Sequence, residues 1–154
     1  MSTYYLDTSA LVKRYAHERG TDWMVSLLTL TFQHDVYTVR LTGPEMVAAL
    51  FRKARTGEIS QSEAIRAANK FRADWQRLYQ IIEVSVDIAD RAMSLVAKHA
   101  LRGYDAVHLA AAVSLQETRR DMELPPLTFI SADDNQLAAA QSEGLTTENP
   151  ALHP

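Results

Sequence analysis

The sequence contains no cysteine among its 154 residues. Structural disulfides, thiolate zinc sites and a cysteine nucleophile are therefore excluded. The N-terminus also lacks the basic start and long apolar region of a signal peptide, so we expect none. The most apolar later stretch, residues 106–115, is interrupted by His108 and Ser114 and is too short to cross a bilayer. We expect a cytoplasmic protein that does not enter the membrane.

The sequence also has no excess of basic residues. It contains 16 Lys and Arg and 19 Asp and Glu, which gives a formal net charge of −3. Dedicated duplex-DNA binders are more often basic. Binding of nucleic acid would therefore rest on a local basic patch or on bound metal, and not on the overall charge. The sequence also lacks a Gly-x-Ser-x-Gly motif, a glycine-rich phosphate loop and a dinucleotide-binding fingerprint.

The length of the chain favours one domain, which we place at residues 1–148. A chain of this size buries about 68–70% of its unfolded surface, enough for a core without disulfides. No internal repeat or low-complexity segment interrupts it. Residues 149–154 are predicted to be a short C-terminal tail with a frayed end.

Strand-like and helix-like runs alternate along the chain. The strand-like runs are rich in β-branched and aromatic residues, and the helical runs have apolar residues at helical spacing. We predict strands at residues 3–7, 36–39, 81–84, 127–130 and, smaller, 145–147. We predict helices at residues 8–15, 21–30, 43–57, 61–79, 86–97, 104–119 and 134–142. This order predicts an α/β fold, a three-layer sandwich whose central parallel sheet of four to five strands is flanked by helices.

Four acidic residues lie in apolar surroundings at the ends of these predicted elements. They are Asp7, Glu45, Asp105 and Asp133. Asp7 and Asp133 follow predicted strands, while Glu45 and Asp105 begin predicted helices. Taken singly, each has an ordinary interpretation as a turn residue, a helix cap or a partner of a helix dipole. Ligands of parallel sheets bind at the carboxyl ends of the strands, however, which favours a common site.

If the four acids converge, their mutual repulsion requires a divalent cation. Oxygen ligands without cysteine favour Mg²⁺ or Mn²⁺ over zinc, and such a site suits phosphodiester hydrolysis. His108 lies three residues after Asp105, on the same helical face. We interpret it as a buried structural histidine and not as a base, because nothing around it resembles a histidine-based catalytic unit.

Three segments resemble motifs of PIN domains, especially those of the VapC-like toxins of bacterial toxin–antitoxin pairs. Residues 5–13, which read YLDTSALVK, resemble the N-terminal motif. Residues 103–111, GYDAVHLAA, resemble the motif of the third acid, and residues 129–134, FISADD, resemble that of the fourth. Glu45 resembles the second acid, which opens a helix. The resemblance extends from about residue 3 to residue 147.

The resemblance implies a PIN-like fold with an acidic pocket, Mg²⁺- or Mn²⁺-dependent cleavage of RNA, a homodimer and a cognate antitoxin that blocks the pocket. It implies that the metal-binding and catalytic quartet is Asp7, Glu45, Asp105 and Asp133. Thr8, Ser9 and Ser131 would orient carboxylates or water through their hydroxyl groups. Asp133 and Asp134 form a doublet, in which the spacing from Phe129 favours Asp133 as the fourth acid and Asp134 as the helix cap or a helper.

Basic residues near these acids are candidates for RNA binding. Lys13 and Arg14 lie near Asp7 in the sequence, and Arg102 lies near Asp105. Two further basic groups would either hold phosphates or form ordinary solvated helix faces. They are Arg52, Lys53 and Arg55 in one predicted helix and Arg66, Lys70 and Arg77 in the next.

The leading hypothesis is an endoribonuclease toxin that inhibits translation. A PIN nuclease of RNA processing or DNA repair is an alternative, as is a catalytically inactive PIN domain that only binds a partner. A phosphatase with Asp7 as nucleophile is disfavoured, because Ser9 stands where a second aspartate is expected.

Overall fold

The computed structural model describes residues 1–30 and 33–154. Within these ranges a single sheet of five parallel strands forms, in the order β3-β2-β1-β4-β5. The strands are β1 (Thr3–Leu6), β2 (Asp35–Val39), β3 (Gln80–Ile82), β4 (Thr128–Ile130) and β5 (Thr146–Glu148). The predicted parallel sheet of four to five strands is therefore confirmed.

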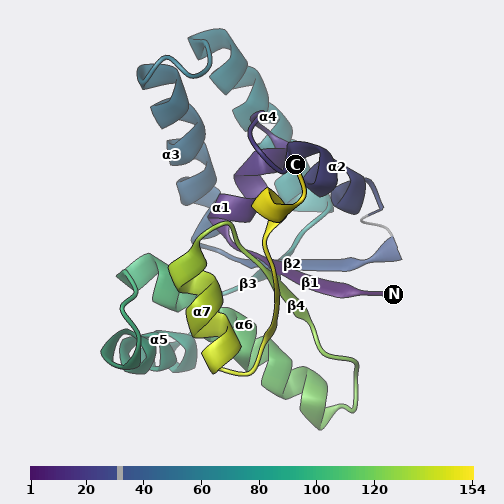
Figure 1. Ribbon diagram of the computed structural model, residues 1–154, viewed down its shortest axis with the longest axis vertical. Helices are drawn as coiled ribbons and strands as arrows, with labels where there is room; N and C mark the ends of the chain where they lie inside the picture. The colour runs from purple at the N-terminus through teal and green to yellow at the C-terminus, as the bar shows by residue number, and fades with distance from the viewer. Residues whose placement is uncertain (31–32) are drawn as a thin grey trace.

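Helices cover both faces of the sheet. They are α1 (Thr8–Leu11), α2 (Thr21–Thr29), α3 (Thr42–Arg55), α4 (Gln61–Arg77), α5 (Val86–Lys98), α6 (Gly103–Asp121) and α7 (Asp134–Ser142). The 3₁₀ turns η1 (Val12–Arg14) and η3 (Pro150–Leu152) add to these. Figure 1 shows α1 to α4 on one side of the sheet and α5 to α7 on the other. This is the predicted three-layer sandwich.

Two apolar cores lie between the three layers. On one face of the sheet, Tyr5 and Phe129 stack with ring centroids 5.4 Å apart and pack in one cluster with α5, α6 and α7. On the other face, Leu6 and Ile130 pack with α1 to α4. Because successive side chains of a strand point to opposite faces, β1 and β4 contribute to both cores. The two strands that precede Asp7 and Asp133 are thus packed on both faces.

The strand order places a topological switch point between β1 and β4. The chain proceeds from β1 outward to β2 and β3, and later returns to place β4 and β5 on the other side of β1. In the register, Leu6 pairs with Ile130, so the residues that follow these two leave the sheet side by side. Ligand sites of open parallel sheets form at such points.

Most elements differ in their limits by one or two residues from the sequence prediction, and three segments illustrate the differences. The helix predicted at residues 8–15 is interrupted, because α1 tightens after Leu11 into the 3₁₀ turn η1, a frequent end of short helices. The third strand ends at Ile82, since Ser85 caps α5 by accepting from the backbone N–H of Ile88. The last strand begins at Thr146, one residue later than predicted.

The C-terminal tail makes specific contacts near α2, which the sequence did not predict. The ring of His153 stacks on Trp23 of α2, with centroids 4.5 Å apart. Arg19 Nε donates to the carbonyl oxygen of Ala151 at 2.7 Å. These partners are at least 130 residues away in the sequence, so no local pattern reveals them. No helix in the described ranges is long and apolar enough to cross a membrane.

Candidate active site

Asp7 lies at the switch point, at the end of β1, with 4% of its surface exposed. Its Oδ1 accepts from Ser9 Oγ at 2.7 Å and, as the N-cap of α1, from the backbone N–H of Ala10 at 3.1 Å. Its Oδ2 accepts from Ser131 Oγ at 2.6 Å. Burial raises the pKa of Asp7, while His108 and the hydroxyl donors act in the opposite direction. The two serines therefore supply the hydrogen bonds that water would otherwise give this carboxylate.

Ser131 connects the loop after β4 to the loop after β1. Its side chain is fully buried, and its Oγ accepts from the backbone N–H of Asp133 at 3.0 Å as it donates to Asp7. Ser9 Oγ in turn accepts from the backbone N–H of Ala132 at 2.9 Å. One hydroxyl group from each loop thus fixes the position of Asp7 relative to Asp133.

Asp133 and Asp134 occupy different surroundings. Asp133 is the N-cap of α7, and its Oδ1 accepts from the backbone N–H groups of Asn135 and Gln136 at 2.9 and 3.3 Å. Asp133 lines the same cavity as Asp7. Asp134 lies one residue further into the helix and lines a separate depression beside Leu152. The positions favour Asp133 as the fourth acid.

Glu45 lies in the first turn of α3 and is held by two side chains. Its Oε1 accepts from Thr8 Oγ1 at 3.0 Å and lies 2.7 Å from His108 Nε2. His108 Nδ1 lies 3.0 Å from the hydroxyl group of Tyr5. His108 Nε2–H donates to Glu45, and the Tyr5 hydroxyl is a donor to Nδ1 where that nitrogen carries no proton. Burial, followed by the charges of Asp7 and Glu45, raises the pKa of Tyr5 well above its usual value, which keeps this donor protonated.

His108 was interpreted from the sequence as buried, and its 1% exposure agrees with that interpretation. The sequence interpretation missed its contact with Glu45, which lies 63 residues earlier. The three-residue spacing from Asp105 was the one available signal, because it placed both side chains on one face of α6.

Asp105 lies in the first turn of α6, where its Oδ2 accepts from Arg102 Nε at 3.2 Å. This hydrogen bond and the charge of Asp105 raise the pKa of Arg102. The backbone carbonyl of Asp105 accepts from the side chain of Gln136 in α7 at 2.8 Å. The Gln136 bond ties the start of α6 to the helix that Asp133 caps.

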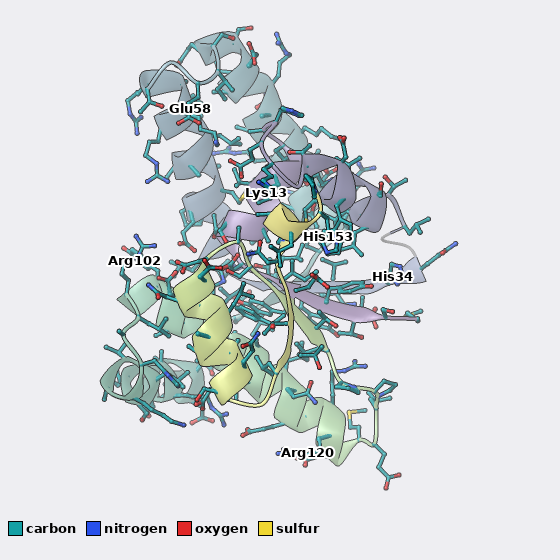
Figure 2. All side chains as sticks on the ribbon, viewed as in Figure 1. Lys13, His34, Glu58, Arg102, Arg120 and His153 are labelled. Carbon is teal, nitrogen blue, oxygen red and sulfur yellow. The ribbon has the colours of Figure 1, made fainter. Side chains whose placement is uncertain are left out.

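A cavity of about 640 Å³ joins these groups at the carboxyl edge of the sheet. All four predicted acids line it, as do Thr8, Ser9, Lys13 and Arg102. Figure 2 labels Arg102, which directly precedes α6, and Lys13, which belongs to η1. Four acids from four separate elements thus face one space.

Arg14, one of the candidate RNA-binding residues, lies apart from the four acids. Its Nε lies 3.8 Å from Asp74 Oδ2 of α4, and it does not line the cavity in the described part of the chain. The two basic groups of α3 and α4 also differ in their positions relative to the cavity. Arg52 and Lys53 line the cavity, whereas the cations of α4 and Arg55 lie elsewhere. Consecutive residues of a helical turn point in different directions, which separates Arg14 from Lys13.

The cavity offers oxygen ligands suited to Mg²⁺ or Mn²⁺. Among the described residues, Glu45 Oε2, Asp105 Oδ1 and Asp133 Oδ2 accept no hydrogen bond, although the other oxygen of each carboxylate does. Over the same ranges, no three His, Asp or Glu side chains are already gathered closely enough to form a metal-binding group. Since Mg²⁺ keeps several waters and uses one or two carboxylates, the donor set fits such an ion without a preformed cage.

Comparisons with known proteins agree with this architecture. The family model described as PIN domain matches residues 4–142. The chain is 33% identical over 118 residues to Ribonuclease VapC45 of Mycobacterium tuberculosis, covering 75% of this chain and 78% of that protein.

Solved structures are similar in fold. One is the Sarcin-Ricin loop cleaving toxin VapC20 of Mycobacterium tuberculosis, with a TM-score of 0.59, 16% identity and coverage of 88% of this chain and 94% of that chain. Another is a toxin-antitoxin complex from Klebsiella pneumoniae, with a TM-score of 0.59, 18% identity and coverage of 96% and 97%. The chain therefore belongs to the PIN domain family, in which it is similar to the VapC ribonucleases.

Proposed function

We propose that this chain is a Mg²⁺- or Mn²⁺-dependent endoribonuclease that hydrolyses phosphodiester bonds of RNA. The observation that carries the proposal is the meeting of Asp7, Glu45, Asp105 and Asp133 on one cavity at the switch point of the sheet. The name of the ribonuclease relative and its 33% identity support the choice of RNA as substrate.

The side chains have distinct tasks in this proposal. When bound, the metal would activate water and neutralise charge on the phosphate that is attacked. Asp7, Asp105 and Glu45 would hold it, and Asp133 would complete the acidic set. The hydroxyl groups of Ser9 and Ser131 keep Asp7 in place, and His108 and Thr8 do the same for Glu45.

The experiment is an RNA cleavage assay with purified protein, with and without Mg²⁺ or Mn²⁺. Asp7→Asn and Asp105→Asn should abolish cleavage while circular dichroism shows an unchanged fold. Asp134→Asn is the matched control, because this acid adjoins Asp133 but lines another depression. It should cleave as the wild type does. Undiminished cleavage by both Asp7→Asn and Asp105→Asn would show that the assigned site is wrong.

The proposal further includes the role of a toxin that acts in the cytoplasm, inhibits translation, forms a homodimer and is blocked by a cognate antitoxin. The structural neighbour described as a toxin-antitoxin complex supports an antitoxin partner. Expression in a growing cell tests this role, and growth arrest that requires Asp7 is expected. Unimpaired growth, together with cleavage in vitro, would favour a nuclease of RNA processing or DNA repair. Calorimetry that detects no Mn²⁺ binding would favour an inactive binding domain.

A further inference from the structure

The cavity that holds the acids continues to a second polar group, which we call the lysine cluster. It consists of Lys13, Glu18, Lys53 and Glu58, all of which line the cavity. Glu18 accepts from both lysines, from Lys13 Nζ at 3.1 Å and from Lys53 Nζ at 2.9 Å. Lys53 Nζ also lies 3.0 Å from Glu58 Oε2. In the view of Figure 2, Lys13 lies below Glu58 and above Arg102.

The four side chains differ sharply in exposure. Only 8% of the Lys13 side chain and 16% of the Lys53 side chain are exposed, compared with 58% for Glu58. Ammonium groups this far from water require partners, and Glu18 supplies one carboxylate for two of them. Lys13, Lys53 and Glu18 together therefore carry one net positive charge. The pair of Lys53 with Glu58 is weak and screened by salt, because Glu58 is largely in water.

Lys53 remains a cation in this position. Burial lowers the pKa of Lys53, but its hydrogen bonds to Glu18 and Glu58 outweigh this effect and raise the pKa. Lys13 is the more buried of the two lysines, and its ammonium group is directed at Glu18. Its place in the cluster is to hold Glu18, which in turn holds Lys53. This arrangement leaves Lys53 as the member of the cluster that a ligand in the cavity can reach.

We propose that Lys53 binds a phosphate of the RNA chain beside the phosphate that is cut, and that Glu58 occupies this position in the free protein. The inference rests on the proposed ribonuclease function. A single-stranded RNA that crosses four carboxylates brings further negative charges with it, so its neighbouring phosphates need cations. An ammonium group is a suitable point charge for a phosphate. When the phosphate replaces the exposed carboxylate of Glu58, the ammonium group of Lys53 still has an anionic partner.

The test measures binding of a short fluorescein-labelled single-stranded RNA by fluorescence anisotropy over a range of NaCl concentrations. It uses the Asp7→Asn background, so that the RNA is bound and not cut. Adding Lys53→Met should weaken binding and reduce the slope of log K against log salt by about 0.7, the value for one phosphate contact with a single strand. Arg55→Met is the matched control, because it removes the same charge from α3 outside the cavity.

Glu58→Gln tests the exchange itself. It should tighten RNA binding relative to Glu63→Gln, which removes the same charge from the exposed start of α4. Equal slopes for Lys53→Met and Arg55→Met would overturn the phosphate contact. No gain for Glu58→Gln over Glu63→Gln would overturn the exchange. No cleavage of RNA by the wild-type protein with Mg²⁺ or Mn²⁺ would instead refute the proposed function, which separates the two failures.

Discussion

Removal of the Ser131 hydroxyl group is the smallest change that reaches two of the four acids. This hydroxyl group is fully buried, donates to Asp7 Oδ2 at 2.6 Å and accepts from the backbone N–H of Asp133 at 3.0 Å. Ser131→Ala deletes one oxygen atom and leaves a buried carboxylate oxygen of Asp7 and a partly buried N–H of Asp133 without this partner. Since a hydrogen bond to a charged group contributes about 1.5–3 kcal/mol and a neutral one about 0.5–1.5, the free energy of unfolding should fall by about 2–4 kcal/mol.

The same variant should change the dependence of RNA cleavage on metal. Groups that orient metal ligands affect metal affinity or activity by roughly 10- to 100-fold when they are removed. We therefore expect the Mg²⁺ concentration for half-maximal cleavage to rise, or the maximal rate to fall, by a factor in that range. Urea unfolding in EDTA and cleavage at a series of Mg²⁺ concentrations measure the two effects separately.

Leu95→Ala is the control for a loss of stability alone. Leu95 is a buried residue of α5 that does not line the cavity, and its truncation should cost about 2–5 kcal/mol. This variant should retain the Mg²⁺ dependence of the wild type at temperatures where it is folded. If Ser131→Ala also retains it, Ser131 does not hold Asp7 for metal binding and the reasoning fails.

Three further variants test separate parts of the structure. Asp7→Asn should raise the melting temperature in EDTA, because burial of a carboxylate is unfavourable, and a lower value would contradict this account. Thr8→Val should reduce RNA cleavage by roughly tenfold without unfolding the protein, since it removes only the hydroxyl donor to Glu45; wild-type rates would count against that contact. Gly20→Ala should lower the free energy of unfolding, measured in urea, by roughly 1–3 kcal/mol. Gly20 has a φ of 91°, and an added Cβ would lie 2.5 Å from the carbonyl oxygen of Pro150. An unchanged urea midpoint would refute this close approach.

The sequence predicted the layers and the sheet because its signals are local. Apolar spacing and caps, such as Ser60 accepting from the backbone N–H of Glu63, act over one or two turns and are visible in the printed chain. Strand ends are less well defined by such signals, which explains the shift at β3. The contacts of the tail could not be predicted for a related reason, since its partners Trp23 and Arg19 come from the other end of the chain.

The candidate acids could be named from the sequence, because a carboxylate in apolar surroundings at the end of a strand or the start of a helix is a visible anomaly. The orienting hydroxyl groups of Thr8, Ser9 and Ser131 were also expected from the resemblance, but the acid that each one holds was not. Lys13 and Arg14 are adjacent in the sequence, yet one lines the cavity and the other lies against Asp74. The two side chains point in different directions because successive residues of a helical turn do so.

The sequence by itself therefore determined the fold class, the order of the four acids and the oxygen-rich chemistry that they offer. Only the tertiary structure decided which group holds which acid: Ser131, 124 residues away, donates to Asp7, and His108, 63 residues away, contacts Glu45. It also decided that Lys13 and Lys53 share the carboxylate of Glu18. Hydrogen bonds and ion pairs of this kind depend on the placement of whole helices against the sheet, and packing of the two cores sets that placement.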